Sequence, residues 1–202
     1  MEVKVLATGS TGNVTAVFAD ETFLLLDCGK PYKWIVGEND FMLPDAVFIT
    51  HEHGDHAKAA GDFLKRGVDI FLTRGTARAL KLRRHNLHTI SAGDLIQVKD
   101  ISVTAIKAHH DAAEPVNFIL QDKIDRVLFV TDTGKIPDVD GDFSKIFIEA
   151  NYREEILREA DLSENQKQRI FENHLSFEQA QKFLAKYQLA EVTLIHKSKR
   201  HF

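Results

Sequence analysis

A group of four potential metal ligands follows directly after a short apolar run, and this group constrains the chain more than any other feature. The run, residues 46–49, has the length and composition of a buried strand. Residues 51–56 then read His-Glu-His-Gly-Asp-His, where the strand would give way to a helix. Unpaired polar groups are costly to bury, so core packing does not explain this concentration of histidine. The sequence therefore predicts a metal site on this loop, with ligands His51, His53, Asp55 and His56.

The spacing of the four side chains makes two neighbouring metal sites possible. His51 and His53 are two residues apart on an irregular loop, so both imidazoles can converge on a single ion. Asp55 and His56 would then aim at a neighbouring point. Zinc accepts imidazole and carboxylate ligands, and manganese or iron accept the same set. We therefore expect two divalent metal ions, Zn²⁺ in the first place and Mn²⁺ as the alternative.

The overall composition is that of an ordinary globular protein. Of the 202 residues, 44% are hydrophobic and 28% are charged, which argues against a disordered, collagenous or disulfide-stapled chain. The length allows one well-cored domain or two small ones. Because no repeat, low-complexity tract or linker marks a boundary, we expect a single domain over residues 1–202.

Membrane insertion and export are not indicated. No apolar run approaches the roughly 18 residues needed to cross a bilayer, and the N-terminus is strand-like, without the apolar region of a signal peptide. The single cysteine, Cys28, excludes an intramolecular disulfide and fits a reducing compartment. We therefore expect a cytoplasmic protein with no membrane partner.

The net charge of −4 counts against a protein that grips long duplexes through many phosphates. The exception is the tail at residues 197–200, where three cations follow a predicted strand. These cations could meet a phosphate, although most such runs are merely solvated.

Short apolar runs and turn residues predict many strands, with helices concentrated near the C-terminus. The helix after the ligand group would begin at Asp55 or His56 and end at Gly67. Ser176, with Gln179 three residues later, forms a capping-box pattern. Strands are expected at 3–7, 14–19, 23–26, 46–49, 69–72, around 90, 95–98, 101–106, 116–120, 127–130, 143–148 and 191–195, and helices at 57–65, 75–82, 153–160, 164–172 and 177–187.

The pattern His-x-His-x-Asp-His after an apolar strand resembles the hallmark of metallo-β-lactamase-fold hydrolases. Further segments, in the same order, resemble the branch with ribonuclease Z-like and YycJ-like proteins, and together they span nearly the whole chain. They are residues 9–13 with 24–29, 109–116, 131–134, 174–176 and 194–198. The resemblance implies an α/β fold, a four-layer αβ/βα sandwich in which two mixed sheets pack face to face with helices outside.

The resemblance also implies a complete dinuclear site. One ion would be held by His51, His53 and His110, and the other by Asp55, His56 and His196. Asp132 would bridge the two ions. The three later ligands each end or follow a predicted strand, which is where a sheet-based fold projects side chains into one cleft. The residues expected to act in catalysis are Asp55, Asp132 and His174.

Two of these ligand assignments have a plainer alternative. His109 could bind the metal and leave His110 on the surface, although the Asp111 that follows favours His110. Asp132 could instead cap the turn before Gly134, a common structural role for aspartate. The family pattern favours His110 and a bridging Asp132.

Other residues near the motifs also allow two interpretations. His196 could be an ordinary strand-end histidine, because Lys197 departs from the leucine usual in that family segment. His174 could contact substrate, support a ligand or protonate the leaving group, or it could be a structural residue beside a helix. Asp27 resembles a family aspartate that orients ligand histidines, with a structural turn as the alternative. Cys28 could approach the metals, but we expect a small buried thiol.

Some residues depart from the family pattern or lie outside it. Residues 149–152 read Glu-Ala-Asn-Tyr, where YycJ-like chains more often carry Ser-Asn-His. Tyr152 thus replaces a histidine, which weakens a nuclease function inferred from that branch, and it could stack on a base or belong to the core. Four histidines outside the motifs are assigned to the surface or to ordinary packing: His85, His88, His109 and His201.

The resemblance implies hydrolysis, and the auxiliary motifs favour a phosphodiester. Two ions about 3.5–4 Å apart can share a water, lower its pKa and neutralise charge on the substrate. The chain is short and acidic and has no inserted domain to clamp a nucleic-acid strand. It resembles compact phage-encoded enzymes that degrade cyclic nucleotide signals in the host cytoplasm. We therefore expect a phosphodiesterase for a small nucleotide, with a cyclic mononucleotide first.

Three alternatives stay open. The closest is an exonuclease of YycJ type acting on the 5′ end of DNA or RNA, in which case the partner is a short nucleic-acid end. A thioesterase and a non-catalytic metal-binding regulator are the others. Related phosphodiesterases are often homodimers, and we expect a homodimer on that ground.

Overall fold

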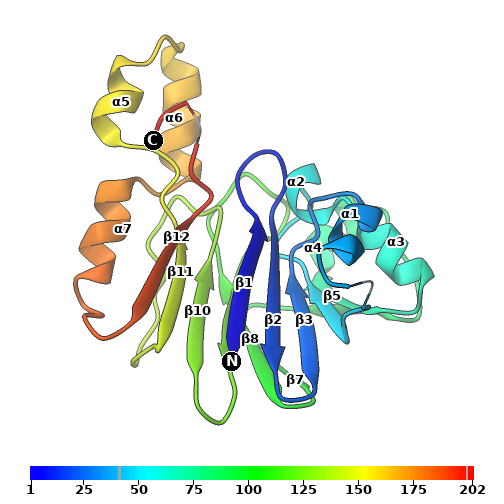
Figure 1. The fold of residues 1–202 in the computed structure, drawn as a ribbon. Helices are drawn as coiled ribbons and strands as arrows, with labels where there is room; N and C mark the ends of the chain where they lie inside the picture. Colours follow the sequence, from blue (N-terminus) through cyan, green and yellow to red (C-terminus); the bar gives the residue numbers. More distant parts are fainter. Residues whose placement is uncertain (41, 199) are drawn as a thin grey trace.

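The computed structural model describes residues 1–40, 42–198 and 200–202. Two six-stranded sheets form its centre (Figure 1). One sheet has the order β1-β2-β3-β4-β5-β6, with β1 Glu2–Ala7, β2 Val14–Ala19, β3 Thr22–Leu26, β4 Ala46–Phe48, β5 Asp69–Thr73 and β6 Leu87–Ile90. The other has the order β12-β11-β10-β9-β8-β7, with β7 Leu95–Val98, β8 Ile101–Lys107, β9 Val116–Gln121, β10 Arg126–Val130, β11 Lys145–Glu149 and β12 Glu191–Ile195.

The two sheets pack face to face through alternate residues of their strands. Leu24 and Leu26 of β3 belong to one buried cluster with Phe118 of β9. The rings of Phe48 in β4 and Phe118 meet edge to face, with centroids 5.6 Å apart. Successive side chains of a strand point to opposite faces, so the residues between these reach the outer layers. The expected single domain over residues 1–202 stays a prediction.

Helices cover the outer faces of both sheets. Leu25 of β3 packs in a cluster with Phe63 of α3, and Ile148 of β11 packs in another with Phe183 of α7. The expected four-layer fold with two mixed sheets is therefore confirmed. Across the described residues, the structure has no helix long and apolar enough to span a membrane. The helices are α1 Tyr32–Gly37, α2 Gly54–Ala57, α3 Ala60–Lys65, α4 Arg74–Ala79, α5 Glu154–Glu159, α6 Glu164–Asn173 and α7 Phe177–Leu184.

Strand direction brings the polar segments to the same edge of the two sheets. Strands β3 to β6 run parallel, and so do β10 to β12. Strand β8 points the same way as β10, because both pair antiparallel with β9. The segments that follow β8, β10 and β12 therefore share one end of the second sheet. The Val116 amide at the start of β9 donates to the Thr50 carbonyl after β4 at 3.0 Å, so the segments that follow all four strands lie at one end of the sandwich. They carry His51, His110, Asp132 and His196.

The helix predicted after the ligand group is wrong in one respect. It is not continuous from Asp55 or His56 to residue 65, but divides into α2 and α3. A continuous helix needs the His56 carbonyl to accept the amide of Ala60. Here that carbonyl accepts the amide of Cys28 at 2.7 Å, and the Cys28 carbonyl accepts the amide of Ala59 at 2.9 Å. A long-range backbone contact thus interrupts the helix and anchors the ligand loop to the end of β3.

Three other helices differ from expectation, and one of them, α7, ends at Leu184 rather than at residue 187. Helix α1 follows Pro31 in a segment for which the sequence predicts no helix. Helix α4 ends at Ala79 rather than at residue 82, and Lys81 has a left-handed backbone with φ of 54°. The chain turns away there because that conformation cannot continue a right-handed helix.

Candidate metal centre

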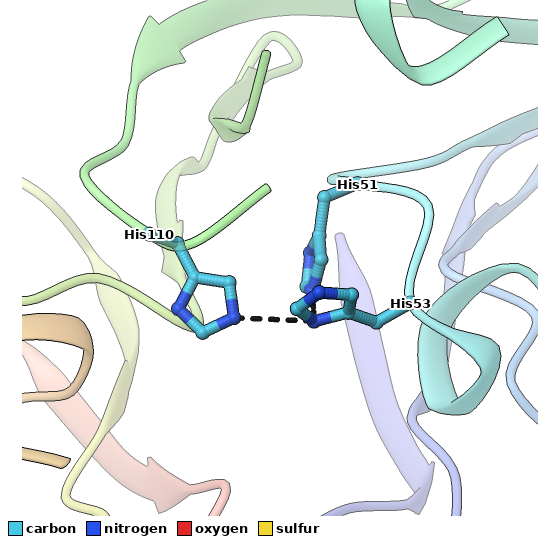
Figure 2. A group of neighbouring side chains, drawn as sticks. All are labelled: His51, His53 and His110. Carbon is cyan, nitrogen blue, oxygen red and sulfur yellow. Dashed lines mark hydrogen bonds between the residues drawn. The ribbon is translucent and has the colours of Figure 1, made fainter. Parts of the chain in front are cut away.

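Three histidines from two loops meet at the sheet edge (Figure 2). The Nδ1 atom of His53 is 3.1 Å from Nε2 of His51 and 3.3 Å from Nε2 of His110. The outer ring nitrogens of the other two are also held, since His51 Nδ1 is 3.0 Å from Thr50 Oγ1 and His110 Nδ1 is 3.0 Å from the Asn173 carbonyl. These bonds leave one nitrogen of each ring facing a common point.

The protonation of this group suits metal binding. Burial, with the nearby His56, holds the pKa of His51 well below its usual value. Burial also lowers the pKa of His110. Both rings are therefore neutral near pH 7, and a neutral imidazole is the form that binds a metal.

A second group lies beside the first and contains Asp55, His56 and His196. The Oδ2 atom of Asp55 is 3.6 Å from Nε2 of His56 and 3.7 Å from Nε2 of His196. Asn13 also faces the group, with its Nδ2 atom 2.9 Å from His56 Nε2. The His196 Nε2 atom is buried and has no hydrogen-bond partner in the described structure. An unpaired buried polar atom of this kind is costly unless a ligand completes it.

Asp132 stands between the two groups. Its Oδ2 atom is 3.6 Å from Nε2 of His110 and 3.9 Å from Nε2 of His51. Its Oδ1 atom is 3.5 Å from Nε2 of His56 and 3.3 Å from Nδ1 of His196. Burial would raise the pKa of Asp132, but the surrounding histidines hold it well below its usual value. One ionised carboxylate thus faces both groups.

The alternative role of Asp132 as a turn cap is not what the structure shows. Its carboxylate accepts the hydroxyl of Thr131 at 2.7 Å. The following amides have other partners, because the Thr133 amide donates to Glu149 and the Gly134 amide donates to the His109 carbonyl. His109 likewise contributes backbone contacts to this loop, whereas the ring of His110 faces the ligand group.

The residues present fit two divalent ions. In each group the candidate ligand atoms all lie within 4.8 Å of one another. Burial alone would lower the pKa of His196, but the carboxylates of Asp132, Asp55 and Glu149 raise it to about 10. Such a pocket favours positive charge, and imidazole and carboxylate are the donors that zinc, manganese and iron accept. The seven ligand assignments made from the sequence stay predictions, and the structure brings all seven side chains together.

Buried polar residues around the groups fix their orientation. Asp27 is fully buried, accepts the Thr50 amide at 2.8 Å and lies 2.7 Å from His56 Nδ1, so that Nε2 of His56 faces the site. Glu52, between two ligand histidines, points away and accepts the amide of Ala113 at 2.7 Å. It therefore ties the loop of His51 to the loop of His110.

His174 is partly buried and pairs with the fully buried Glu149. His174 Nδ1 is 3.0 Å from Glu149 Oε2, and Glu149 Oε1 accepts the amides of Thr133 and Leu175. Burial lowers the pKa of His174, but the Glu149 carboxylate outweighs it and the net pKa is raised. The ring of His174 stacks on His196 and lines the cleft beside the metal groups. Because Nδ1 faces Glu149, Nε2 is the nitrogen left for exchange with a bound molecule.

A cleft of about 390 Å³ opens over the two groups. One wall contains His174 and five of the metal-ligand residues, namely His53, Asp55, His110, Asp132 and His196. Side chains of α6 form the other wall, among them Gln166, Arg169 and Ile170. Arg169 Nη2 pairs with Asp111 Oδ2 at 2.6 Å and so joins the two walls. The C-terminal segment closes the cleft with Lys197, Ser198 and His201.

Comparison with known proteins identifies the fold family. Residues 25–197 match the family described as the β-lactamase superfamily domain. The chain belongs to this family. The exodeoxyribonuclease YycJ of Bacillus anthracis is 30% identical over 174 residues, which are 78% of this chain and 66% of that protein. The exodeoxyribonuclease WalJ of Streptococcus pneumoniae is 30% identical over 198 residues, which are 86% of this chain and 72% of that protein.

Solved structures share the fold at low identity. The metallo-β-lactamase-fold protein YhfI of Bacillus subtilis has a TM-score of 0.74 at 16% identity, over 98% of this chain and 86% of that one. Human tRNase Z, short form, has a TM-score of 0.74 at 15% identity, over 99% and 93%. Zn²⁺-bound PqqB of Methylobacterium extorquens has a TM-score of 0.71 at 16% identity, over 95% and 78%. The chain is thus a member of the metallo-β-lactamase fold, and it spans just under two thirds of the length of the Bacillus anthracis relative.

The structure shows where three further residues lie, namely Cys28, Tyr152 and His201. Cys28 is fully buried in the core of the first sheet, and burial raises the pKa of its thiol, so it is a core residue. Tyr152 is 2% exposed and packs edge to face on Phe171, which rules out stacking on a base. His201, assigned to the surface or to packing, lines the cleft.

Glu149 is the site residue that sequence reasoning missed. It was noted only as a departure from the family segment, yet it is fully buried and holds His174. A signal was present, because Glu149 ends a strand, as the predicted ligands do. A carboxylate at the end of a buried strand is a candidate site residue, as Asp132 is.

Proposed function

We propose that the chain is a dinuclear metal-dependent phosphodiesterase that cleaves nucleotides from the end of a nucleic-acid strand. The observation that carries this proposal is the placement of Asp132, whose two carboxylate oxygens face two separate groups of metal-ligand residues. Two relatives at 30% identity are exodeoxyribonucleases, and one of them matches 86% of this chain. These relatives favour the exonuclease alternative over the cyclic mononucleotide that the sequence put first.

The residues of the site would have two roles, metal binding and orientation of the metal ligands. His51, His53 and His110 would hold one ion, Asp55, His56 and His196 the other, and Asp132 both. Such ions supply a water of lowered pKa and neutralise charge on a phosphoryl group. Asp27, Thr50 and the Asn173 carbonyl would keep the ligand rings in their orientations, which preserves the geometry without rearrangement during the reaction.

His174 would handle the proton of the leaving group. Its Nδ1 faces the Glu149 carboxylate, and the raised pKa favours a ring that carries a proton at Nε2. A phosphodiester that breaks leaves an alkoxide, which needs a proton, and a positioned acid of this type contributes about 100- to 10,000-fold. Glu149 acts on the reaction only through His174 and is a positioning residue.

The test is a parallel screen of the purified, metal-loaded protein. The substrates are a 5′-labelled single strand of DNA and of RNA, cyclic mononucleotides, cyclic dinucleotides, a thioester and bis-p-nitrophenyl phosphate. We expect release of the labelled 5′ nucleotide from the strand and hydrolysis of the small phosphodiester. The Asp132→Ala variant should lose both activities and keep the circular dichroism spectrum of the parent.

Each other result has a defined meaning. Cleavage of a cyclic nucleotide without strand shortening would return the function to the first expectation from the sequence. Cleavage of the thioester alone would make the chain a thioesterase, and no turnover by a protein loaded with metal would make it a regulator. The expected homodimer also stays a proposal, which light scattering of the purified protein decides.

A further inference from the structure

A cluster of positive side chains lies outside the cleft, on α4 and the loop that leads to β6. It lines a hollow of about 490 Å³ whose lining includes Leu82 and Leu87 and no acidic residue. All five cations are exposed, and none is within ion-pair distance of a carboxylate of the described residues. We call this the basic α4 surface; its residues are Arg74, Arg78, Lys81, Arg83 and Arg84.

The basic α4 surface is positively charged, although the chain as a whole is acidic. The protein carries 26 Lys and Arg against 30 Asp and Glu, a net charge of −4. Residues 74–84 hold five cations and no acidic residue. The basic tail is different, because Lys197 places its ammonium group over the ring of Phe202 at 4.8 Å. Unpaired cations in one hollow of an acidic protein provide a positive potential that attracts polyanions.

The basic α4 surface adjoins the metal-ligand wall. The Thr76 hydroxyl of α4 donates to Glu52 at 3.4 Å, and Glu52 lies between His51 and His53 in the chain. The Gly75 amide donates to Glu114 at 2.7 Å. The two carboxylates at this junction therefore accept hydrogen bonds from the protein, which reduces their repulsion of a passing phosphate.

We propose that the basic α4 surface binds the sugar-phosphate backbone of a single nucleic-acid strand whose end lies in the cleft. This inference rests on the proposed phosphodiesterase function and names its substrate class as an extended strand. Arg74 and Arg78 are four residues apart on one helix and thus share a face, with about 5–6 Å between their Cβ atoms. No aromatic side chain lines the hollow, so it offers phosphate contacts and no base-stacking platform. A cyclic mononucleotide would fit wholly in the cleft and would not reach this surface.

The test compares two triple charge reversals with the same change of net charge. The first, Arg78→Glu/Lys81→Glu/Arg84→Glu, removes the centre of the basic α4 surface. The control, Lys33→Glu/Lys182→Glu/Lys186→Glu, reverses exposed lysines on α1 and around α7. Fluorescence anisotropy measures binding of the metal-loaded proteins to a labelled phosphorothioate-linked strand of about 20 nucleotides, long enough for several phosphate contacts.

We expect the first variant to bind this strand about 100-fold more weakly at about 0.1 M salt, because it loses the phosphate contacts of three cations. Each lost contact lowers the slope of log affinity against log salt by about 0.7 for single strands. Its slope of log affinity against log salt should shrink by about 2, and the control should stay within about twofold of the parent. Hydrolysis of bis-p-nitrophenyl phosphate should be unchanged in both variants. Equal losses in both variants, an unchanged salt slope, or equal affinity of the parent for polyglutamate or for anionic vesicles would overturn the inference.

The two proposals fail in different ways. A parent that hydrolyses the small ester but binds the strand no better than the first variant refutes the strand surface and leaves the phosphodiesterase standing. A parent that cleaves no phosphodiester refutes the enzyme, and with it the substrate role of this surface, whatever the anisotropy shows.

Discussion

The two walls of the cleft are built in opposite ways. On the ligand wall, Asp132 and His196 are each 4% exposed. Behind that wall, His51, His56 and Asp27 are at most 1% exposed, and each makes a hydrogen bond to another buried group. On the α6 wall, none of the ten residues of the helix is buried. Preorganised ligands support the chemistry, whereas an exposed helix can adapt its side chains to a substrate. The difference supports the proposed metal binding at the first wall, and we propose that the second wall contacts the substrate.

The walls meet at Gly134. A Cβ atom there would lie 1.7 Å from the Glu172 carbonyl oxygen at the end of α6, so only glycine allows this approach. Gly134 follows Asp132 by two residues, and its amide donates to the His109 carbonyl at 2.7 Å. The position of α6 is thus tied to the loop of the proposed bridging carboxylate.

Removal of the metals should have the largest effect on activity, and it should loosen the ligand wall but not the α6 wall. Dialysis against a chelator should lower phosphodiester hydrolysis by at least about 100-fold, since it removes the electrostatic stabilisation of the reaction. Hydrogen exchange should speed up in residues 51–56 and 109–111 and change little in α6. Equal loosening of both walls, or activity that survives the chelator, would contradict the division.

The Asp27→Asn variant should have the second-largest effect, because Asp27 orients the ligand His56 from the side away from the cleft. The Thr50 amide and His56 Nδ1 face different oxygens of Asp27, and asparagine replaces one of these oxygens with an NH2 group, so one of the two hydrogen bonds is lost. We expect metal affinity or activity to fall about 10- to 100-fold, as when other outer partners of metal ligands are removed. Titration with a metal indicator measures the affinity, and added Zn²⁺ should restore part of the activity. Unchanged metal affinity would show that Asp27 is only structural.

Gly134→Ala tests the junction of the walls. The new methyl group must displace the Glu172 carbonyl, and overpacking of this kind costs about 1–3 kcal/mol. We expect activity to fall on the order of tenfold, because small misplacements of catalytic groups are costly. Gly37→Ala is the matched control, since a Cβ atom there meets nothing within 4 Å. Similar kinetics and melting temperatures for the two variants would refute the tight junction.

Ser163→Ala should have the smallest effect, confined to the α6 wall. Ser163 caps α6 in a capping box with Gln166, and loss of such a cap costs about 1 kcal/mol. The helix should fray at its start, beside Leu162 and Gln166 of the cleft, and KM for a strand substrate should rise a few-fold while kcat and metal content hold. Ser102→Ala, at a partly exposed position of β8, is the control. A fall in metal content would contradict the separation of the walls.

The same contrast explains what could be predicted from the sequence. The ligand loop was predictable because its side chains are close in the chain. His110, Asp132 and His196 were expected from the family resemblance, and each also follows a strand that the apolar pattern reveals. The division of the helix at residues 58–59 was not, because it depends on backbone bonds to Cys28, far away in the chain.

Side chains outside the motifs were harder to place. Glu149 was treated as a departure from a family segment, although it holds His174 from a fully buried position. Tyr152, beside it, could belong to either the core or the site until packing against Phe171 placed it in the core. The basic α4 surface was not predicted, although residues 74–84 hold five cations and no acidic residue, because the sequence does not show that these side chains line one hollow.

Metal content measures the central claim most directly. Plasma mass spectrometry of the purified protein, after loading with Zn²⁺ or Mn²⁺ and removal of free metal, should find two ions per chain. The Asp132→Ala variant should hold one ion or none, with an unchanged circular dichroism spectrum. A parent that holds no metal, or an Asp132→Ala variant that keeps both ions at the parent's affinity, would contradict the account of a dinuclear site bridged by this carboxylate.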